Sequence, residues 1–222
     1  MGHSKMIDGI DNPSTFFEKN VINPNSKLEF GAQETSFLRK KAGHLYLIGS
    51  SFFWSIIDTI SGIGTTVKSI FTQNDDAWIR ANQKTKSSRM IVAYPHLQVL
   101  YVLNGNLKTT KSMEGDGLFT HYVQSLLIKT LAQGTFRDSN YLFLKHVASR
   151  LTFAIAAIAC IVARVADAVI GALAAVLSIA TFGRVEILNA AAYRGLQFTG
   201  IIHDLSYLTT KIINPWAGGQ GR

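Results

Sequence analysis

The residues with the clearest potential for chemistry are two charges inside a long apolar run. Between Arg150 and Arg184 the only charged residues are Arg164 and Asp167, which are three positions apart and therefore share one face of a helix. Within a membrane, such residues could form an ionisable site on an ion or proton path. They could also neutralise one another at a helix contact. We favour this second interpretation, because Asp167 has a counterpart elsewhere in the chain and Arg164 has none.

The other reactive groups do not form a recognisable catalytic or metal site. His203 and Asp204 form the only His-Asp dipeptide, and no further metal ligands stand near them in the sequence. Cys160 is the only cysteine, which excludes an intramolecular disulfide, and its apolar neighbours are typical of a small buried hydrophobe. P-loop, Gly-x-Ser-x-Gly, His-Glu-x-x-His and dinucleotide motifs are all missing from the sequence. We therefore expect no enzymatic activity, no cofactor and no metal.

The sequence also contains an internal similarity. The segment Asp58–Thr72 aligns without a gap on Asp167–Thr181, and in both segments the aspartate is followed four positions later by a glycine, Gly62 or Gly171. On a helix this glycine leaves space beside the carboxylate for a crossing helix or a hydrogen-bond donor. We predict a duplicated unit of roughly 70 residues, in which Asp58, Gly62, Asp167 and Gly171 form a repeated interhelical contact. Capping or surface aspartates beside simple packing glycines are the alternative.

Periodicity predicts a mostly α fold with two related helical halves, of which the C-terminal half is strongly apolar and Ala-rich. The predicted parts are a flexible polar arm (1–36), a first helical repeat (37–104), a connecting segment with one helix (105–142), a second, apolar repeat (143–215) and a flexible tail (216–222). Within them, we expect helices over 37–72, 77–84, 90–103, 118–131 with Gly134 just past the end, 185–195 and 200–213.

The apolar run Leu151–Phe182 would be about 48 Å long as one helix, which exceeds the hydrocarbon core of a bilayer, roughly 30 Å. Three arrangements remain open: a tilted membrane helix, two halves joined near Ala163 to Asp167, or the buried core helix of a soluble assembly. Small residues recur at four-residue spacing in this run and would allow another helix to pack closely. The spacing does not indicate which helix that is.

Composition favours a membrane location. Charged residues make up 16% of the chain, well below the quarter that is usual in soluble domains. The net charge of +8 favours anionic partners such as lipid headgroups. The basic residues are dispersed and no nucleic-acid motif accompanies them, so nucleic acid is not expected as a partner. A cytoplasmic location is the alternative.

Several short segments in the C-terminal third resemble a known group of proteins. Arg164–Ala175, Leu188–Ala190, Gly200–Leu205 and Lys211–Pro215 resemble uncharacterised membrane-associated proteins of chlamydia-type obligate intracellular bacteria. The resemblance implies a protein at the bacterial or host-vacuole membrane, including the secreted inclusion-membrane type. That type carries a hydrophobic hairpin with a short turn, whereas Ala163 to Asp167 contains neither Gly nor Pro.

These observations together predict a non-catalytic, membrane-associated helical protein that acts in interaction or scaffolding. Its expected partners are the lipid bilayer and either a second copy of itself or another host or bacterial membrane protein. A small membrane pore or transport component built on Arg164 and Asp167 is the first alternative. A soluble helical bundle with an Ala-rich core helix is the second.

Overall fold

The computed structural model describes residues 15–25, 37–72, 75–105, 107 and 113–217. Across these residues the chain is almost entirely helical, and no strand occurs among them. The predicted fold class, mostly α, is therefore confirmed.

The described helices follow the same order twice. In each case a first helix precedes a long helix, and two further helices separated by a 3-10 segment come after it. The first set consists of the helix over 16–25 with its π-helical part η2 (Glu18–Ile22), α2 (Phe37–Thr72), α3 (Asp75–Lys86), η3 (Ser87–Arg89) and α4 (Met90–Leu103). The second set consists of α5 (Phe119–Val123), η5 (Gln124–Arg137), η6 (Leu144–Ala148), α6 (Ser149–Ala180), α7 (Glu186–Gly195), η7 (Leu196–Gly200) and α8 (Ile201–Ile213).

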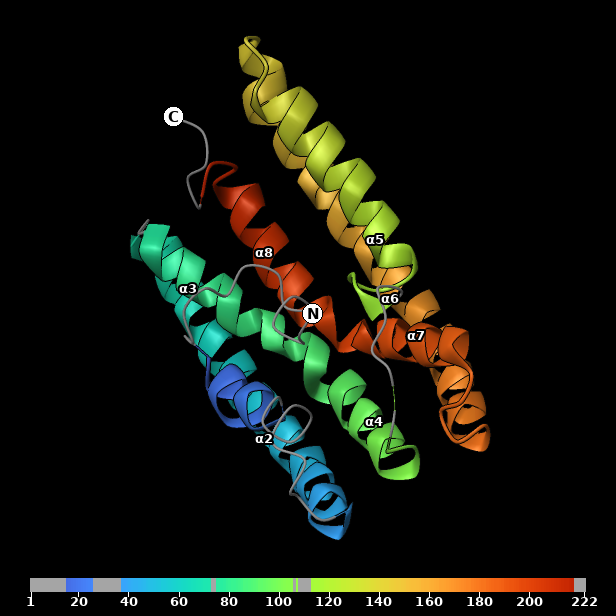
Figure 1. The fold of residues 1–222 in the computed structure, drawn as a ribbon. Coiled ribbons are helices and arrows are strands. Elements are labelled where there is room, and N and C mark those ends of the chain that lie inside the picture. Colours follow the sequence, from blue (N-terminus) through green and yellow to red (C-terminus); the bar gives the residue numbers. More distant parts are fainter. Residues whose placement is uncertain (1–14, 26–36, 73–74, 106, 108–112, 218–222) are drawn as a thin grey trace.

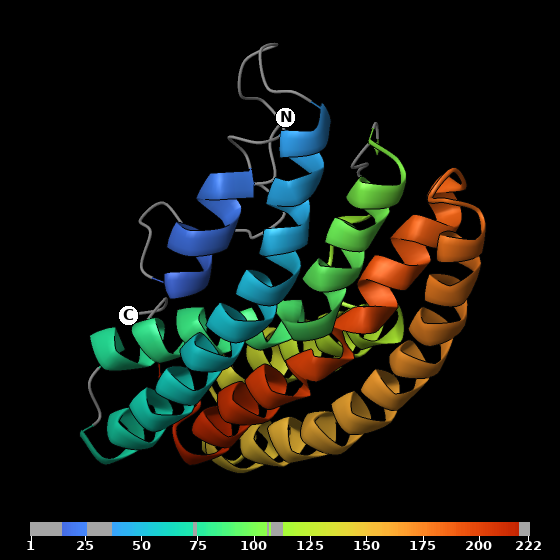
Figure 2. The ribbon, with the colours of Figure 1, turned by 90° about the horizontal axis from the view of Figure 1, so that it is seen from below.

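The two sets run in opposite directions. Figures 1 and 2 show α2 and α6 pointing opposite ways along the molecule, and in each set the two later helices pack back against the long one. The segments η3 and η7 contact each other where the sets meet, while α4 packs on α7 and α8 packs on α3. The contacts between the sets are therefore reciprocal, as in an arrangement with approximate twofold symmetry.

Both sets also end in the same way. Asn104 after α4 and Asn214 after α8 have extended backbones, with φ/ψ of −123/92° and −132/96°. Each asparagine amide donates to the carbonyl four residues earlier at 2.7 Å, and each asparagine carbonyl accepts the amide three residues later at 3.1 Å. These matched details support the duplication, which itself stays a prediction.

Most helix positions agree with the sequence prediction. Helices α2 and α4 have the predicted bounds, and α3, α7 and α8 differ from them by one or two residues at an end. The apolar run, for which one or two helices were possible, forms the single helix α6 as far as Ala180. This helix ends at a tight turn in which Gly183, at φ +66°, donates its amide to the Ser178 carbonyl.

Three predicted boundaries are wrong. Residues 16–25 were expected in a flexible arm but form a helix, because Phe17, Val21 and Ile22 bury its inner face against the core. The helix predicted to stop before Gly134 continues to Arg137. The described start of the predicted tail is also held, since Lys211 Nζ donates to the Ala217 carbonyl at 2.6 Å. The rest of the arm, 1–14 and 26–36, and the rest of the tail, 218–222, lie outside the described residues.

Two apolar clusters form the core. The larger lies between the sets, where Tyr94, Leu97 and Leu100 of α4 meet Tyr193 of α7 and Leu196 of η7. The smaller fills the space where η5 and α8 pack against the first half of α6. Its buried members are Ile128, Ala132, Phe153, Ala156, Cys160 and Leu208.

The long helix α2 buries polar side chains and exposes apolar ones. Its buried residues include a single large hydrophobe, Leu47, and are otherwise polar, charged or glycine: His44, Ser51, Ser55, Asp58, Thr59, Gly62, Thr66 and Ser69. Its outer face exposes large apolar side chains: Phe37, Leu38, Leu45, Tyr46, Phe52, Phe53, Ile60, Ile63, Val67 and Phe71. This pattern is the reverse of the one expected for a helix on the surface of a soluble protein.

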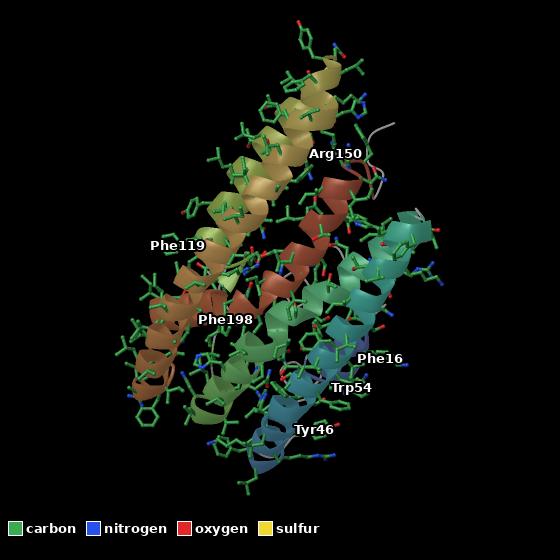
Figure 3. The ribbon with its side chains drawn as sticks, turned by 180° about the vertical axis from the view of Figure 1, so that it is seen from behind. Phe16, Tyr46, Trp54, Phe119, Arg150 and Phe198 are labelled. Carbon is green, nitrogen blue, oxygen red and sulfur yellow. The ribbon has the colours of Figure 1, made fainter. Side chains whose placement is uncertain are left out.

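Helix α6 has the same reversed pattern. The residues that it buries are mainly small or polar: Ser149, Thr152, Phe153, Ala156, Cys160, Ala163, Arg164, Asp167, Gly171, Ala174 and Ser178. Along the opposite side of α6 and of η6 just before it, exposed aliphatic residues recur every three or four positions: Val147, Leu151, Ile155, Ile158, Val162, Val165, Val169, Leu173 and Val176. Figure 3 shows side chains projecting outward along this edge of the molecule. The apolar stripe is therefore continuous over eight turns of helix.

Candidate functional site

A buried cluster of charged side chains lies at the centre of the molecule, around Arg164 of α6. Its Nε donates to Asp204 Oδ2 of α8 at 2.8 Å, and one terminal nitrogen donates to Asp116 Oδ1 at 2.7 Å. The other terminal nitrogen donates to the Gln197 carbonyl of η7 at 3.0 Å. The side chain is only 1% exposed, so the guanidinium depends on these partners in place of water.

Arg89 and Gln124 complete this cluster. Arg89 of η3 binds the second oxygen of Asp116 at 2.7 Å and lies 3.7 Å from Asp204 Oδ1. The Gln124 amide donates to both Asp116 and Asp204, at 3.0 Å in each case. Two guanidinium groups thus balance two carboxylates, which is the condition for keeping charges out of water.

The two carboxyl groups differ in their affinity for a proton. Burial acts to raise the pKa of Asp116, but the positive charges of Arg89 and Arg164 outweigh it and the pKa is lowered. Burial prevails at Asp204, whose pKa is raised although Arg164 and Arg89 oppose the shift. Asp204 is therefore the carboxyl group of the cluster that binds a proton first as the pH falls.

The predicted ion pair between Arg164 and Asp167 is not formed, and this interpretation is corrected. Asp167 instead accepts backbone hydrogen bonds from Leu118, Phe119 and Thr120, at 3.0, 2.7 and 3.3 Å, and one from the Thr120 hydroxyl at 2.7 Å. It thereby caps the first turn of α5 from a distant helix, where a negative charge is favoured. The two side chains lie close, but each is directed to other partners.

Asp58 makes the corresponding contact in the first set. Its two carboxylate oxygens accept hydrogen bonds from the backbone amides of Phe16 and Phe17, at 3.1 and 2.7 Å, at the start of the helix over 16–25. Asp58 and Asp167 therefore each hold the N-terminus of the helix that precedes their own long helix. This common geometry supports the predicted equivalence of the two aspartates and gives it a physical role as a cap supplied from another helix.

The glycines that follow these aspartates occur at close helix contacts. A β-carbon on Gly62 would lie 2.8 Å from the backbone nitrogen of Thr85 at the end of α3. A β-carbon on Gly171 would lie 2.7 Å from the Cα of Gly195 at the end of α7. Both positions are too crowded for a side chain, so each glycine allows the returning helix to approach the long helix.

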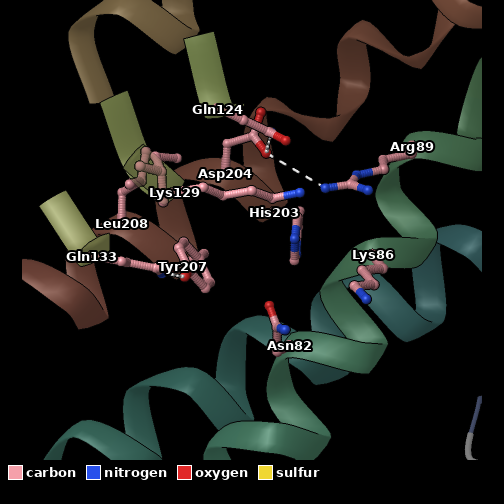
Figure 4. Close-up of a pocket in the computed structure, with 11 residues that line it drawn as sticks. Asn82, Lys86, Arg89, Gln124, Lys129, Gln133, His203, Asp204, Tyr207 and Leu208 are labelled. Atoms are coloured by element: carbon pink, nitrogen blue, oxygen red, sulfur yellow. Dashed lines mark hydrogen bonds and ion pairs between the residues drawn. The ribbon is translucent and has the colours of Figure 1, made fainter. Parts of the chain in front are cut away.

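A pocket of about 190 Å³ opens beside the charged cluster. It lies between α3, η3, η5 and α8, so both sets contribute to its wall (Figure 4). The lining residues are Asn82, Lys86, Arg89, Gln124, Ile128, Lys129, Gln133, His203, Asp204, Tyr207 and Leu208. Three of these side chains are cationic, and one is a carboxylate.

The remaining reactive groups have structural partners or are enclosed. A ring nitrogen of His203 is 2.9 Å from the Thr85 hydroxyl, and burial, followed by the nearby Arg89, lowers the His203 pKa well below its usual value. Cys160 is buried in the smaller apolar cluster. Among the described residues, no group of three or more His, Cys, Asp and Glu side chains is placed to hold a metal ion.

Sequence reasoning missed three members of the site: Arg89, Asp116 and Gln124. Asp116 lies in a loop 48 positions before Arg164, and Arg89 lies in a polar segment of the other set. Neither belongs to a recognisable motif. The charge of Arg164 in an apolar run was the available signal, because such a charge requires partners, and these can come from elsewhere in the fold.

Comparison with known proteins provides no assignment for this arrangement: no family model, curated protein or solved structure matches the chain.

Proposed function

We propose that this chain is a non-catalytic, membrane-embedded helical protein in which α2 and the helix over 144–180 contact lipid. The observation that carries the proposal is the reversed distribution of side chains on these two helices. Small and polar groups face the interior, where the hydroxyl groups of α2 mostly donate to carbonyls of their own helix, and large aliphatic and aromatic groups face outward. Water would disfavour such a surface strongly, whereas lipid tails are as apolar as the side chains themselves.

Length and composition support the same location. The helices over Phe37–Thr72 and Leu144–Ala180 are long and apolar enough to cross a membrane. The second has 37 residues, about 55 Å, and only 33% of its most apolar window is buried within the fold. A core helix of a soluble bundle would be covered on most sides, so the low burial favours lipid over the soluble alternative.

The basic residues at the ends of the 144–180 helix fit this placement. Arg150 is exposed near one end and Arg184 is exposed just past the other, while the stripe between them has no exposed charge. Because phosphate headgroups are anionic, flanking cations would anchor both ends of the stripe. The helix exceeds the hydrocarbon thickness, so it would tilt or extend into the headgroup region.

Alkaline carbonate extraction of membranes that contain the full chain tests this proposal. We expect the protein to stay in the pellet, since the stripe is held by apolar contact that high pH does not weaken. Recovery of most of the protein in the supernatant would contradict the proposal. Ile158→Lys and Val165→Lys, which place charge in the stripe, should both increase the released fraction, whereas Glu186→Lys beyond the helix should not.

We infer a scaffolding or interaction role, since the part of the chain that the structure describes forms no recognised catalytic arrangement. The partner would be a second copy of the chain or another membrane protein. On the basis of the sequence resemblance, we propose the bacterial or host-vacuole membrane as the location of this interaction. Cross-linking of the full chain in native membranes tests this role. A discrete cross-linked species of fixed size is expected, and an exclusively monomeric product would contradict it.

One observation favours transport as a second candidate function. The two sets run antiparallel, and their 3-10 segments meet where the Thr199 hydroxyl donates to the Ser88 carbonyl at 2.6 Å, beside Arg89 of the charged cluster. Antiparallel repeats with interrupted helices meeting at a polar site are the architecture of many secondary transporters. Flux of small ions into liposomes containing the protein would support this function. Flux equal to that of protein-free liposomes would exclude it for the ions tested.

A further inference from the structure

The pocket beside the charged cluster has features of a binding site for an anion. Cationic side chains reach it from three elements: Lys86 from α3, Arg89 from η3 and Lys129 from η5. The carboxylate on its wall, Asp204, is already paired with Arg164 at 2.8 Å. Arg89 is likewise paired with Asp116 at 2.7 Å, so Lys86 and Lys129 are the lining cations that lie outside this balanced cluster.

Two of these cations face each other. Figure 4 shows the Lys129 and Arg89 side chains pointing toward one another from opposite sides of the pocket. Asp116 and Asp204 already offset the charge of Arg89, at 2.7 and 3.7 Å, and an anion in the pocket would offset the charge of Lys129 in the same way. The Nε atom of Arg89 is also buried, and it has no hydrogen-bond partner among the described residues. Because this atom is enclosed, a ligand in the pocket could accept its hydrogen bond only after a shift of the Arg89 side chain.

The other lining groups indicate the chemical class of the anion. Asn82, Gln133 and Tyr207 supply neutral hydrogen-bonding groups, and Ile128 and Leu208 supply apolar surface on the η5 and α8 side. Cations placed on three sides suit a tetrahedral group whose oxygens point in several directions. A carboxylate, with two oxygens in one plane, is matched better by a single guanidinium fork.

We propose that this pocket binds a phosphate group carried by a small molecule or a lipid headgroup, with Lys86, Arg89 and Lys129 as its cationic ligands. The volume of about 190 Å³ admits a phosphate with a small substituent. The proposal does not depend on the membrane location, because both the pocket and its charges belong to the folded chain.

The test is calorimetric titration of the full chain in an uncharged detergent and a phosphate-free chloride buffer. The probes are inorganic phosphate, glycerol 3-phosphate and phosphatidic acid in mixed micelles. Saturable binding of either soluble probe identifies a free phosphate compound, and saturable binding of phosphatidic acid alone identifies a headgroup. Both results support a phosphate site, whereas no saturable binding of any probe overturns it.

Variants link the binding to these residues. Lys129→Met should weaken the affinity at least tenfold, and because Lys129 is exposed the variant should keep the unfolding temperature of the parent protein. Lys86→Met should also weaken binding. Lys19→Met, which removes an exposed lysine of the helix over 16–25 that does not line the pocket, is the matched control and should leave the affinity unchanged. Equal affinity in the parent protein and the Lys129→Met variant would overturn the assignment even if phosphate binds elsewhere.

Discussion

Arg164 and Asp204 should show a large energetic coupling, and replacing Arg164 with methionine provides the perturbation. The change removes two charge-assisted hydrogen bonds, at 2.7 and 2.8 Å, and one to the Gln197 carbonyl. It also leaves Arg89 as the only cation beside Asp116 and Asp204. Loss of one partner from a buried ion pair costs about 3 to 5 kcal/mol, so we expect a loss of about 4 kcal/mol in the free energy of unfolding.

The double replacement tests the origin of this cost. Asp204→Leu alone leaves Arg164 with Asp116 as its remaining carboxylate and should cost about 3 kcal/mol. In the double variant Arg164→Met, Asp204→Leu, the cluster is neutral again, because Arg89 and Asp116 still pair at 2.7 Å. The double variant should therefore be no less stable than Arg164→Met, giving a coupling of at least about 3 kcal/mol.

The assay is unfolding of the purified chain in mixed micelles with increasing SDS, followed by circular dichroism. Arg164→Met combined with Asp138→Leu is the control, since Asp138 is an exposed residue that pairs with Arg137. That combination should be additive. A double Arg164 and Asp204 variant whose loss equals the sum of the two single losses would refute the account of the cluster as a set of mutually dependent charges.

Three further predictions concern packing, capping and pH. Gly171→Ala should destabilise the fold by about 2 kcal/mol or more, because the added β-carbon meets the backbone of α7. Gly64→Ala places its β-carbon where nothing lies within 4 Å, so it should be neutral or stabilising by up to about 1 kcal/mol. Equal unfolding temperatures for the two variants would contradict the close contact at Gly171. Asp58→Ala and Asp167→Ala should each cost about 1 to 2 kcal/mol in the same unfolding assay by removing a helix cap, and a neutral result for either would show that its cap is dispensable. Burial lowers the pKa of His96 to about 4, so the unfolded chain is protonated before the folded chain as the pH falls. The free energy of unfolding should therefore fall by about 3 kcal/mol between about pH 6.5 and pH 4. Unfolding measured across this pH range should show the loss in the parent protein, and His96→Gln should lack it.

Local periodicity was enough to predict most helices. The bounds of α2 and α4 follow from apolar spacing and from the asparagine that ends α4. The helix over 16–25 was missed because Asn12-Pro13 before it and Asn23-Pro24 in its last turn are both turn signals. Its buried side chains, Phe17 and Val21, have the four-residue spacing of a helical face, but the short segment depends on the cap from Asp58, which lies 41 positions after Phe17.

The candidate site could be predicted from the sequence less well than the helices. Arg164 and Asp167 were identified as important, but spacing on one helix favoured pairing them with each other. Their actual partners lie 33 to 49 positions away, in loops and helices whose approach depends on the whole fold. Tertiary contacts of this kind leave no periodic trace, so Asp116 and Arg89 could not have been selected beforehand.

The most direct test of the membrane proposal is the solvent exposure of the outer stripe on α6. A nitroxide label at Val165→Cys, in a Cys160→Ala background, can be probed in reconstituted vesicles by collision with oxygen and with a water-soluble nickel chelate. The proposal predicts high oxygen and low nickel accessibility at Val165, with the reverse at a Glu186→Cys control beyond the helix. High nickel accessibility at Val165, equal to that at Glu186, would show that the stripe faces water and would contradict the account.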